Sequence, residues 1–254
     1  MNSALKIKAE LRVADGHEAA DSSLLVPVAE GYERWAPIYD HVPNPLLACE
    51  ERYLMPLLTD LGGKTVLDLA CGTGRWLERL RAQGCRSGVG IDRSRAMLRV
   101  AGGKSAIRGR LAGADCETLP FSGASFDLVI CSFALGHVED LGSVARELAR
   151  VTKIGADVLV SDLHPEAYAR GWRVGFRDGE TAVQIEMQRR SVEEIVRAFS
   201  SNSFECRTRA SLRLGRPEEA LFVRAGKSHS FADACQLPAV LVCHFRRRPV
   251  EAHL

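Results

Sequence analysis

Two glycines stand between an apolar run and an amphipathic segment, where a strand would pass into a helix. Residues 66–76 have the sequence VLDLACGTGRW, which places Gly72 and Gly74 in the turn. A turn without side chains at these positions lets a nucleoside approach the backbone closely. A dinucleotide-binding sequence would carry a third glycine three residues after Gly74, but Leu77 stands there. The turn therefore favours a nucleoside over the pyrophosphate of a dinucleotide.

The segments that would position this turn alternate between strand-like and helix-like patterns. Short apolar runs cover residues 65–70, 88–91, 111–114, 126–132 and 156–161. Amphipathic segments cover residues 75–83, 93–101 and 141–151. This alternation predicts a doubly wound α/β fold, in which a parallel sheet has right-handed crossovers. Ligands of such sheets bind beyond the carboxyl ends of the strands, where the glycine turn would lie.

The segments that precede and follow this core complete the expected domain. Residues 1–29 show little periodicity, and we expect a poorly ordered lead-in with one short strand at 5–13. Residues 30–61 show helical spacing interrupted by prolines, which predicts a kinked helical N-terminal cap. Residues 166–190 contain the turn-like sequence RDGE at 177–180, which predicts a hairpin insertion over the site.

The C-terminal part, residues 191–254, is expected to finish the sheet. Its expected elements are a helix at 191–200 with Ser191 as N-cap, strands at 204–214 and 239–246, and a partly helical connection at 218–236. With the cofactor-binding core at 62–165, residues 30–254 are predicted to form one domain. Its expected architecture is a mostly parallel, seven-stranded, Rossmann-like sheet.

Composition agrees with one soluble globular domain. Of the 254 residues, 46% are hydrophobic and 26% charged, and no apolar run is long enough to cross a bilayer. The formal charge is +2 and the basic residues are scattered apart from arginines at 246–248, so nothing predicts a nucleic-acid or membrane partner. The eight cysteines form no Cys-x-x-Cys pair and no zinc-like cluster, and no signal-peptide pattern is present. We therefore expect a cytoplasmic protein without a metal site.

Four short motifs end the expected strands in an order known from one family. They are DLACGTG at 68–74, GIDRS at 90–94, GADCETLPF at 113–121 and FDLVICS at 126–132, and residues 32–40 add Tyr-x-x-x-Ala-x-x-Tyr-Asp. Together they resemble the class I S-adenosylmethionine-dependent methyltransferases, over about residues 32–163. The pattern at 32–40 is similar to the small-molecule branch that includes ubiquinone and menaquinone methyltransferases. The resemblance implies S-adenosylmethionine as cofactor and a small-molecule methyl acceptor.

The resemblance also implies which side chains bind the cofactor. Asp92 would accept hydrogen bonds from both ribose hydroxyls, and Asp115 would accept one from the exocyclic amine of adenine. The full implied set is Tyr32, Tyr39, Asp68, Ala70, Gly72, Gly74, Asp92, Arg93, Asp115, Cys116 and Cys131. Alternatives stay open, with Asp68 as a helix cap, Asp92 as a helix N-terminal acid, Asp115 as a loop residue, and the aromatic residues at 32, 35 and 39 as core of the cap.

The expected reaction needs alignment more than activation. The sulfonium of the cofactor is already activated, so the protein must hold a nucleophile in line with the methyl carbon and exclude water. A general base is required only if the acceptor loses a proton. His137 and His164, which follow the fourth and fifth expected strands, are the candidates because imidazole titrates near neutrality. The alternatives are that His137 packs beside the methionyl group and that His164 is a turn residue bonded to backbone.

Trp35, Trp172 and Arg173 are the candidates for contact with the acceptor. Residues 171–177 would put aromatic surface and positive charge over the pocket, which suits an aromatic or carboxylate-bearing acceptor. An exposed hairpin with solvated arginines is the alternative. We therefore interpret the chain as a methyltransferase, and the rival readings are an NAD-dependent oxidoreductase and a module that binds the cofactor without turnover.

Overall fold

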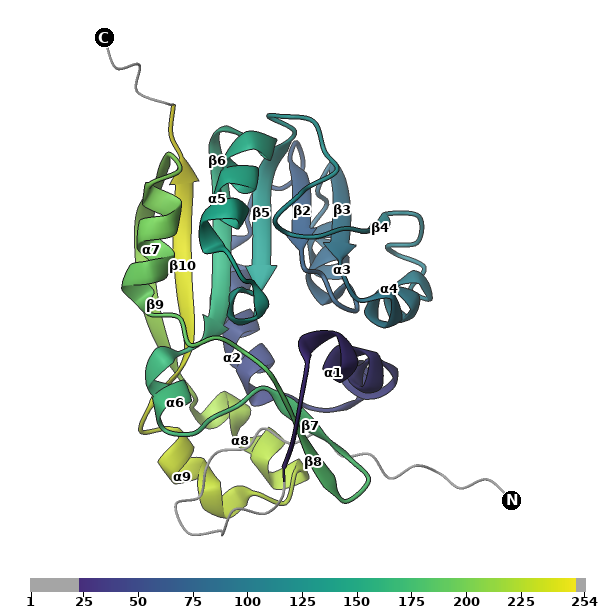
Figure 1. Ribbon diagram of the computed structural model, residues 1–254, viewed down its shortest axis with the longest axis vertical. Helices are drawn as coiled ribbons and strands as arrows, with labels where there is room; N and C mark the ends of the chain where they lie inside the picture. The colour runs from purple at the N-terminus through teal and green to yellow at the C-terminus, as the bar shows by residue number, and fades with distance from the viewer. Residues whose placement is uncertain (1–22, 250–254) are drawn as a thin grey trace.

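The computed structural model describes residues 23–249, and its centre is a sheet of seven strands in the order β4-β3-β2-β5-β6-β10-β9 (Figure 1). The strands are β2 (Thr65–Leu69), β3 (Ser87–Asp92), β4 (Leu111–Gly113), β5 (Phe126–Ser132), β6 (Thr152–Leu163), β9 (Phe204–Arg213) and β10 (Pro238–Arg247). Strands β4, β3, β2, β5 and β6 are parallel, whereas β10 is antiparallel to both β6 and β9. The predicted mostly parallel, doubly wound sheet is confirmed. The strand expected at 5–13 lies outside the described residues.

Helices cover both faces of this sheet. Figure 1 shows α5 (Leu141–Val151) and α7 (Val192–Ser200) in front of it, where Leu148 and Phe199 pack against Val129 and Phe245 of the strands. The other face is covered by α2 (Pro45–Leu54) and α3 (Arg75–Ala82), and its buried cluster includes Leu54, Trp76, Val66 and Val240. Because the central strands are buried on both faces, their sequences are continuous apolar runs.

Local capping signals fix where the helices begin. Ser94 caps α4 (Arg95–Gly102) and Asp140 caps α5 through their side-chain oxygens. Ser191 and Glu194 form a reciprocal capping box at the start of α7, which confirms the predicted N-cap. These bonds satisfy amide groups that have no partner within the helix.

The N-terminal segments form the expected kinked cap. It consists of α1 (Val28–Trp35), the 3-10 helix η1 (Ala36–His41), α2, and the 3-10 helix η2 (Met55–Leu57). Proline occupies the first or second position of η1, α2 and η2, where its missing amide proton costs no helical hydrogen bond. In Figure 1, α1 lies beyond the carboxyl ends of β2 and β5. The cap is therefore placed over the edge of the sheet where ligands of this fold bind.

The predicted hairpin forms, and the segment before the cap joins it. β7 (Gly175–Asp178) pairs antiparallel with β8 (Thr181–Ile185). β1 (Leu24–Val26) pairs in parallel with β8, so the chain has regular structure from residue 24, where we expected a lead-in up to residue 29. Val26, Trp35, Phe176 and Ile185 form a small core with Met97 between hairpin, cap and α4.

The remaining elements connect these parts. They are η3 (Leu135–His137) after β5, α6 (Pro165–Ala169) after β6, and α8 (Arg216–Arg224), η4 (Ser228–Ser230) and α9 (Phe231–Ala234) between β9 and β10. The last three confirm the expected partly helical connection at 218–236. Among residues 23–249, none of the helices has the length and apolar character that a membrane span requires.

Candidate active site

The glycine turn between β2 and α3 has an unusual backbone. Ala70, Gly72 and Gly74 have φ values of +54°, +54° and +82°, in the left-handed region that favours glycine. A Cβ atom on Gly74 would lie 2.3 Å from Cδ1 of Ile107, whereas a Cβ on Gly72 would meet no atom within 4 Å. Gly74 is thus required by internal packing. Gly72 is required by its backbone angle and faces open space, as a residue beside a ligand would.

Asp68 lies beneath the turn. Its carboxyl is 2% exposed, and Oδ2 accepts a hydrogen bond of 2.8 Å from the amide of Leu77 in the first turn of α3. Burial raises the pKa of this carboxyl to about 7. This geometry is that of the helix-capping alternative: Asp68 ties the end of β2 to the start of α3 and thereby holds the glycine turn in place.

Asp92 connects the glycine turn to the next strand. At the end of β3, its Oδ2 accepts a 2.7 Å hydrogen bond from the amide of Gly72, and its Oδ1 accepts one of 2.7 Å from the amide of Ser94. Burial raises its pKa. A carboxylate offers about four acceptor positions, so each oxygen can accept one more hydrogen bond. The side chain can therefore bind a diol while it fixes the turn.

The third and fourth motifs place a carboxylate and two thiols at the neighbouring strand ends. Asp115 is 44% exposed, and its Oδ1 accepts a hydrogen bond of 2.9 Å from the amide of Glu117. Arg93 is 86% exposed, and its guanidinium lies 3.6 Å from Asp115 Oδ2. Burial raises the pKa of Cys116 to about 12 and also raises that of Cys131 well above its usual value, so both thiols are neutral. The site here has a neutral floor, while Arg93 lies at its exposed rim.

The cap contributes a cluster of aromatic rings. Trp35 stacks on Tyr32 with 6.0 Å between ring centroids and meets Tyr39 edge-on at 4.8 Å. Trp35 also stacks on Phe176 of the hairpin at 5.3 Å. Burial raises the pKa of Tyr39 to about 12, so its hydroxyl stays protonated. These contacts match the alternative that the rings form the core of the cap, and they leave Tyr32 and Tyr39 facing the strand ends.

A hydrogen bond that the sequence did not indicate ties the cap to the glycine turn. The Thr73 hydroxyl donates to Asp40 Oδ1 at 2.6 Å. Lys104 lies 2.8 Å from Asp40 Oδ2 and 3.0 Å from Glu78 of α3. The cap is therefore held against the turn by polar contacts as well as by its apolar core.

His137 has a defined tautomer. Its Nδ1 lies 3.0 Å from the carbonyl oxygen of Glu186, which only accepts, so Nδ1 carries the proton. Its Nε2 lies 2.9 Å from the hydroxyl oxygen of Tyr32 and accepts a hydrogen bond from that hydroxyl. Burial lowers the pKa of His137, which keeps the ring neutral at pH 7. The structure thus presents an unprotonated Nε2 beside Tyr32, as a general base requires.

His164 is arranged differently. It is buried at the N-cap of α6, where Nδ1 accepts a hydrogen bond of 3.2 Å from the amide of Glu166. Its Nε2 therefore carries the proton and lies 3.0 Å from the hydroxyl of Ser211 on β9. The unprotonated nitrogen thus accepts from the backbone, which is the geometry of the turn alternative.

The two residues of the hairpin insertion that we expected to contact the acceptor lie in different environments. Trp172 is 1% exposed and belongs to the buried cluster that also contains Trp76 and Ala167, and its amide donates to the Ala167 carbonyl at 3.0 Å, at the end of α6. Its ring therefore does not lie over a pocket, contrary to our expectation. The Arg173 guanidinium lies 4.1 Å above the ring of Tyr168 and lines a cleft together with Trp35.

Two buried charged groups were missed from the sequence. Glu50 of α2 is fully buried and accepts hydrogen bonds from Arg75, Trp76 and Ser161. Arg75 follows the glycine turn directly, so this network joins cap, turn and β6. A glutamate within an amphipathic helix gives no sequence signal of burial, since most such residues are solvated.

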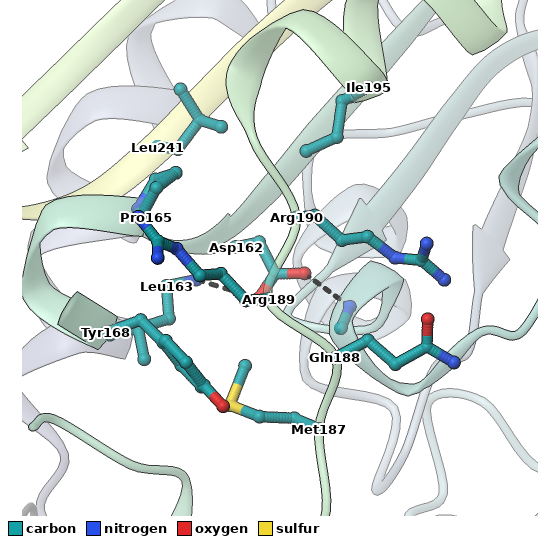
Figure 2. Close-up of a pocket in the computed structure, with 11 residues that line it drawn as sticks. Asp162, Leu163, Pro165, Tyr168, Met187, Gln188, Arg189, Arg190, Ile195 and Leu241 are labelled. Carbon is teal, nitrogen blue, oxygen red and sulfur yellow. Dashed lines mark hydrogen bonds between the residues drawn. The ribbon is translucent and has the colours of Figure 1, made fainter.

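Asp162, at the end of β6, is the second buried charged group that was missed from the sequence. Its Oδ2 accepts a hydrogen bond of 2.8 Å from the amide of Gly136, and its Oδ1 accepts one of 2.7 Å from Leu163 (Figure 2). Burial raises the pKa of this carboxyl to about 6. Figure 2 shows the segment with Met187 and Gln188 passing in front of it. Asp162 thereby fixes η3, which carries His137. The sequence signal that could have identified Asp162 is its position at the end of an apolar run.

Comparison with known proteins identifies the class to which this architecture belongs. Residues 66–155 match the family model for a methyltransferase domain. A demethylmenaquinone methyltransferase of Thermobifida fusca is 34% identical over 143 residues, which cover 53% of this chain and 60% of that protein. A 2-phytyl-1,4-naphtoquinone methyltransferase of Synechococcus elongatus is 35% identical over 158 residues, which cover 56% and 66%. The chain thus spans less than two thirds of the length of these relatives.

Solved structures agree on the fold. The crystal structure of an S-adenosylmethionine dependent methyltransferase from Mesorhizobium loti superposes with a TM-score of 0.64 at 20% identity, over 80% of this chain and all of that one. The fold is that of the class I, S-adenosylmethionine-dependent methyltransferases. Residues 66–155 form a methyltransferase domain, as the resemblance of the motifs implied.

Proposed function

We propose that the protein transfers a methyl group from S-adenosylmethionine to a small-molecule acceptor. One observation carries this proposal: the backbone beside Gly72 is unobstructed, and its amide is bonded to Asp92 at the carboxyl ends of adjacent strands. A nucleoside with a free diol fits these two features. The neutral thiols of Cys116 and Cys131 and the rings of Tyr32 and Tyr39 complete the uncharged part of the setting around Asp92.

The residues around the turn would hold the cofactor in defined roles. Asp92 would accept from the ribose hydroxyls and Asp115, through its free oxygen, from the adenine amine. Asp68, Ala70 and Gly74 would fix the backbone of the turn, and Arg93 would lie at the rim. S-adenosylmethionine supplies, when bound, a methyl group on an activated sulfonium. The cap would exclude water from that group.

The chain's own part in the reaction is positioning and proton removal. His137 presents its unprotonated Nε2 at the end of β5, oriented from behind by the carbonyl of Glu186. It would take the proton of a hydroxyl or phenol acceptor directly or through Tyr32. We no longer propose Trp172 as an acceptor contact. We keep His164 as the comparison for His137, because its unprotonated nitrogen, Nδ1, accepts a hydrogen bond from the backbone amide of Glu166, whereas that of His137 accepts from a side-chain hydroxyl.

The scope of the proposal extends to partner and compartment. The small net charge supports a small-molecule acceptor over nucleic acid, and the free cysteines support a reducing cytoplasm. We place the start of the domain at β1 instead of residue 30, because β1 pairs with the hairpin. An NAD-dependent oxidoreductase is disfavoured by Leu77 in place of the third glycine.

Replacing Asp92 with alanine should weaken binding of S-adenosylmethionine by about 10- to 150-fold, or on the order of 1.5 to 3 kcal/mol, since a charge-assisted hydrogen bond to a buried diol is lost. Asp115→Ala should cost less, because that carboxylate is half exposed. Calorimetry on both variants measures the difference, and thermal unfolding reports whether the glycine turn survives. Equal affinity of Asp92→Ala and the parent would remove Asp92 from the site.

Two measurements test the function itself. Calorimetry should show binding of S-adenosylmethionine and its demethylated product but not of NAD; binding of NAD alone would reverse the assignment. Mass spectrometry of reactions with an acceptor library that includes demethylmenaquinone should then show a product heavier by one methylene. Tight cofactor binding without product on any acceptor would favour the rival reading of a binding module.

A further inference from the structure

A cleft between the cap and the hairpin opens beside the candidate base. Aromatic and apolar side chains form its walls, and Arg173 lies at the start of the hairpin on one side. The walls that matter here are Tyr32, Trp35, Tyr39, Leu46 and Phe133. The cleft is open to solvent on one side. Its aromatic and apolar lining is of the kind that binds small organic molecules.

The cleft is continuous with the proposed reaction site. Tyr32 lines it and donates its hydroxyl proton to Nε2 of His137. Phe133 lines it and directly follows β5, with a strained φ of +51°. Tyr39 lines it from the cap and lies close enough to Asp92 for that charge to affect its pKa. A molecule in the cleft would thus lie between the cofactor residues and the hairpin.

The charge on the side chains that line the cleft is positive. Among the described residues that line it, Arg173 alone is charged, and none is an aspartate or a glutamate. The Nη1 group of Arg173 donates to the carbonyl oxygens of Tyr168 at 2.8 Å and Trp172 at 2.7 Å, and the ring of Tyr168 lies beneath the guanidinium. These contacts hold the guanidinium in place and engage only part of its five donors. A held cation with donors to spare is a receptor for a carboxylate.

A second donor on the same wall points to a ligand. Trp35 is only 6% exposed, and its indole N–H is buried without a hydrogen-bond partner among the described residues. Buried donors are almost always paired, and leaving one unpaired costs about 1 to 3 kcal/mol. Trp35 lines the cleft together with Arg173. A ligand acceptor group that displaced the atoms covering this nitrogen would satisfy the donor.

We propose that the methyl acceptor is an aromatic molecule with a carboxylate, whose ring lies between Tyr32, Trp35 and Phe133 and whose carboxylate is bound by Arg173. This inference rests on the proposed function and names the substrate class of that site. Aromatic rings prefer aromatic walls in stacked or edge-on contact. The free-energy cost of removing the carboxylate from water is offset only where it lies beside a positive charge. A neutral ring compound would leave the remaining donors of Arg173 unused.

The test compares 3-hydroxy-2-naphthoate with its methyl ester, which has the same ring without the charge. Calorimetry on the full chain, with and without S-adenosylhomocysteine, should show the carboxylate binding at least about 10-fold more tightly. Arg173→Ala should weaken the carboxylate by about 10- to 100-fold and the ester by less than about threefold. Arg170→Ala removes the same charge from an exposed site outside the cleft and should change neither. Trp35→Phe replaces the indole with a smaller aromatic ring that has no donor, and it should weaken binding of the carboxylate by about 3- to 10-fold.

Equal binding of carboxylate and ester to the parent would overturn the proposal, and so would an equal loss of both in Arg173→Ala. Circular dichroism and unfolding of each variant identify any loss that comes from misfolding, and Arg173→Lys, which keeps the charge, then decides between charge and packing. Binding of S-adenosylhomocysteine is measured separately. Its absence would remove the methyltransferase proposal, whereas its presence together with failure of the carboxylate comparison would remove only the substrate class.

Discussion

Gly72→Val should abolish binding of S-adenosylmethionine and leave the fold largely intact. Gly72 has φ +54°, an angle that β-branched residues adopt only with strain, and its amide must stay in place to reach Asp92. A valine side chain would also project into the open space where no protein atom lies within 4 Å. Strain and obstruction act together on the same few atoms. We expect affinity to fall by more than about 100-fold in calorimetry, which corresponds to about 2.7 kcal/mol.

Two other glycines provide matched controls. Gly63→Val changes a loop glycine with open surroundings and no left-handed backbone, and it should leave affinity unchanged. Gly74→Val would press on Ile107, where even a Cβ atom would lie at 2.3 Å, so this variant should lose stability as well as binding. Thermal unfolding separates the two outcomes. A well-folded Gly72→Val protein that binds S-adenosylmethionine normally would show that the first motif is misplaced.

Local patterns were enough to predict the sheet, because each strand is a separate apolar run between turn signals. β5 was predicted with its observed bounds, and β2 differs by one residue at its end. The hairpin was predicted from four residues, and Asp178 and Thr181 pair as that turn requires. These elements depend on residues close together in the chain. Their prediction therefore needed no knowledge of the tertiary structure.

The orientation of His137 could not be predicted, because it depends on three distant segments. The Glu186 carbonyl accepts a hydrogen bond from Nδ1–H, and the Glu186 amide donates one of 2.9 Å to the carbonyl of Val26. Val26 belongs to β1, in a stretch to which we assigned no regular structure. Tyr32 supplies the other partner from the cap. The sequence indicated which strand carries the histidine, while its tautomer is set by a parallel pairing that has no local signature.

Buried polar groups escaped prediction for a similar reason. Glu50, Asp162 and Thr73 are polar residues whose burial follows from how helices and strands pack. Trp172 shows the same limit from the other side: it was expected to contact the acceptor, but it is buried in the core. Spacing identifies a strand end, whereas the direction of a side chain there depends on its neighbours in three dimensions.

His137→Ala should lower the rate of methyl transfer to a hydroxyl or phenol acceptor by about 10² to 10⁴, the contribution typical of a positioned base. The affinity for S-adenosylmethionine should stay within a few-fold, since the ring contacts Tyr32 and Glu186 and none of the strand-end carboxylates is its hydrogen-bond partner. Calorimetry and single-turnover mass spectrometry measure the two quantities separately.

The pH profile should identify the base. Burial lowers the pKa of His137 below its usual 6.5, so the neutral, proton-accepting form grows as pH rises through that lowered value. The parent rate should therefore rise over the acidic range and then level off. The variant lacks this step. Its deficit should shrink at high pH, where the acceptor ionises without help.

Tyr32→Phe and His164→Ala decide how the proton leaves. If the acceptor replaces the Tyr32 hydroxyl at Nε2, Tyr32→Phe should retain most of the rate; if the hydroxyl relays the proton, that variant should lose about as much as His137→Ala. His164→Ala should be mild in activity, because its nitrogens serve Glu166 and Ser211. A crippling His164→Ala together with a nearly silent His137→Ala would reverse the assignment. If neither His137→Ala nor His164→Ala lowered the rate, the protein would act by proximity alone, on an acceptor that arrives already deprotonated.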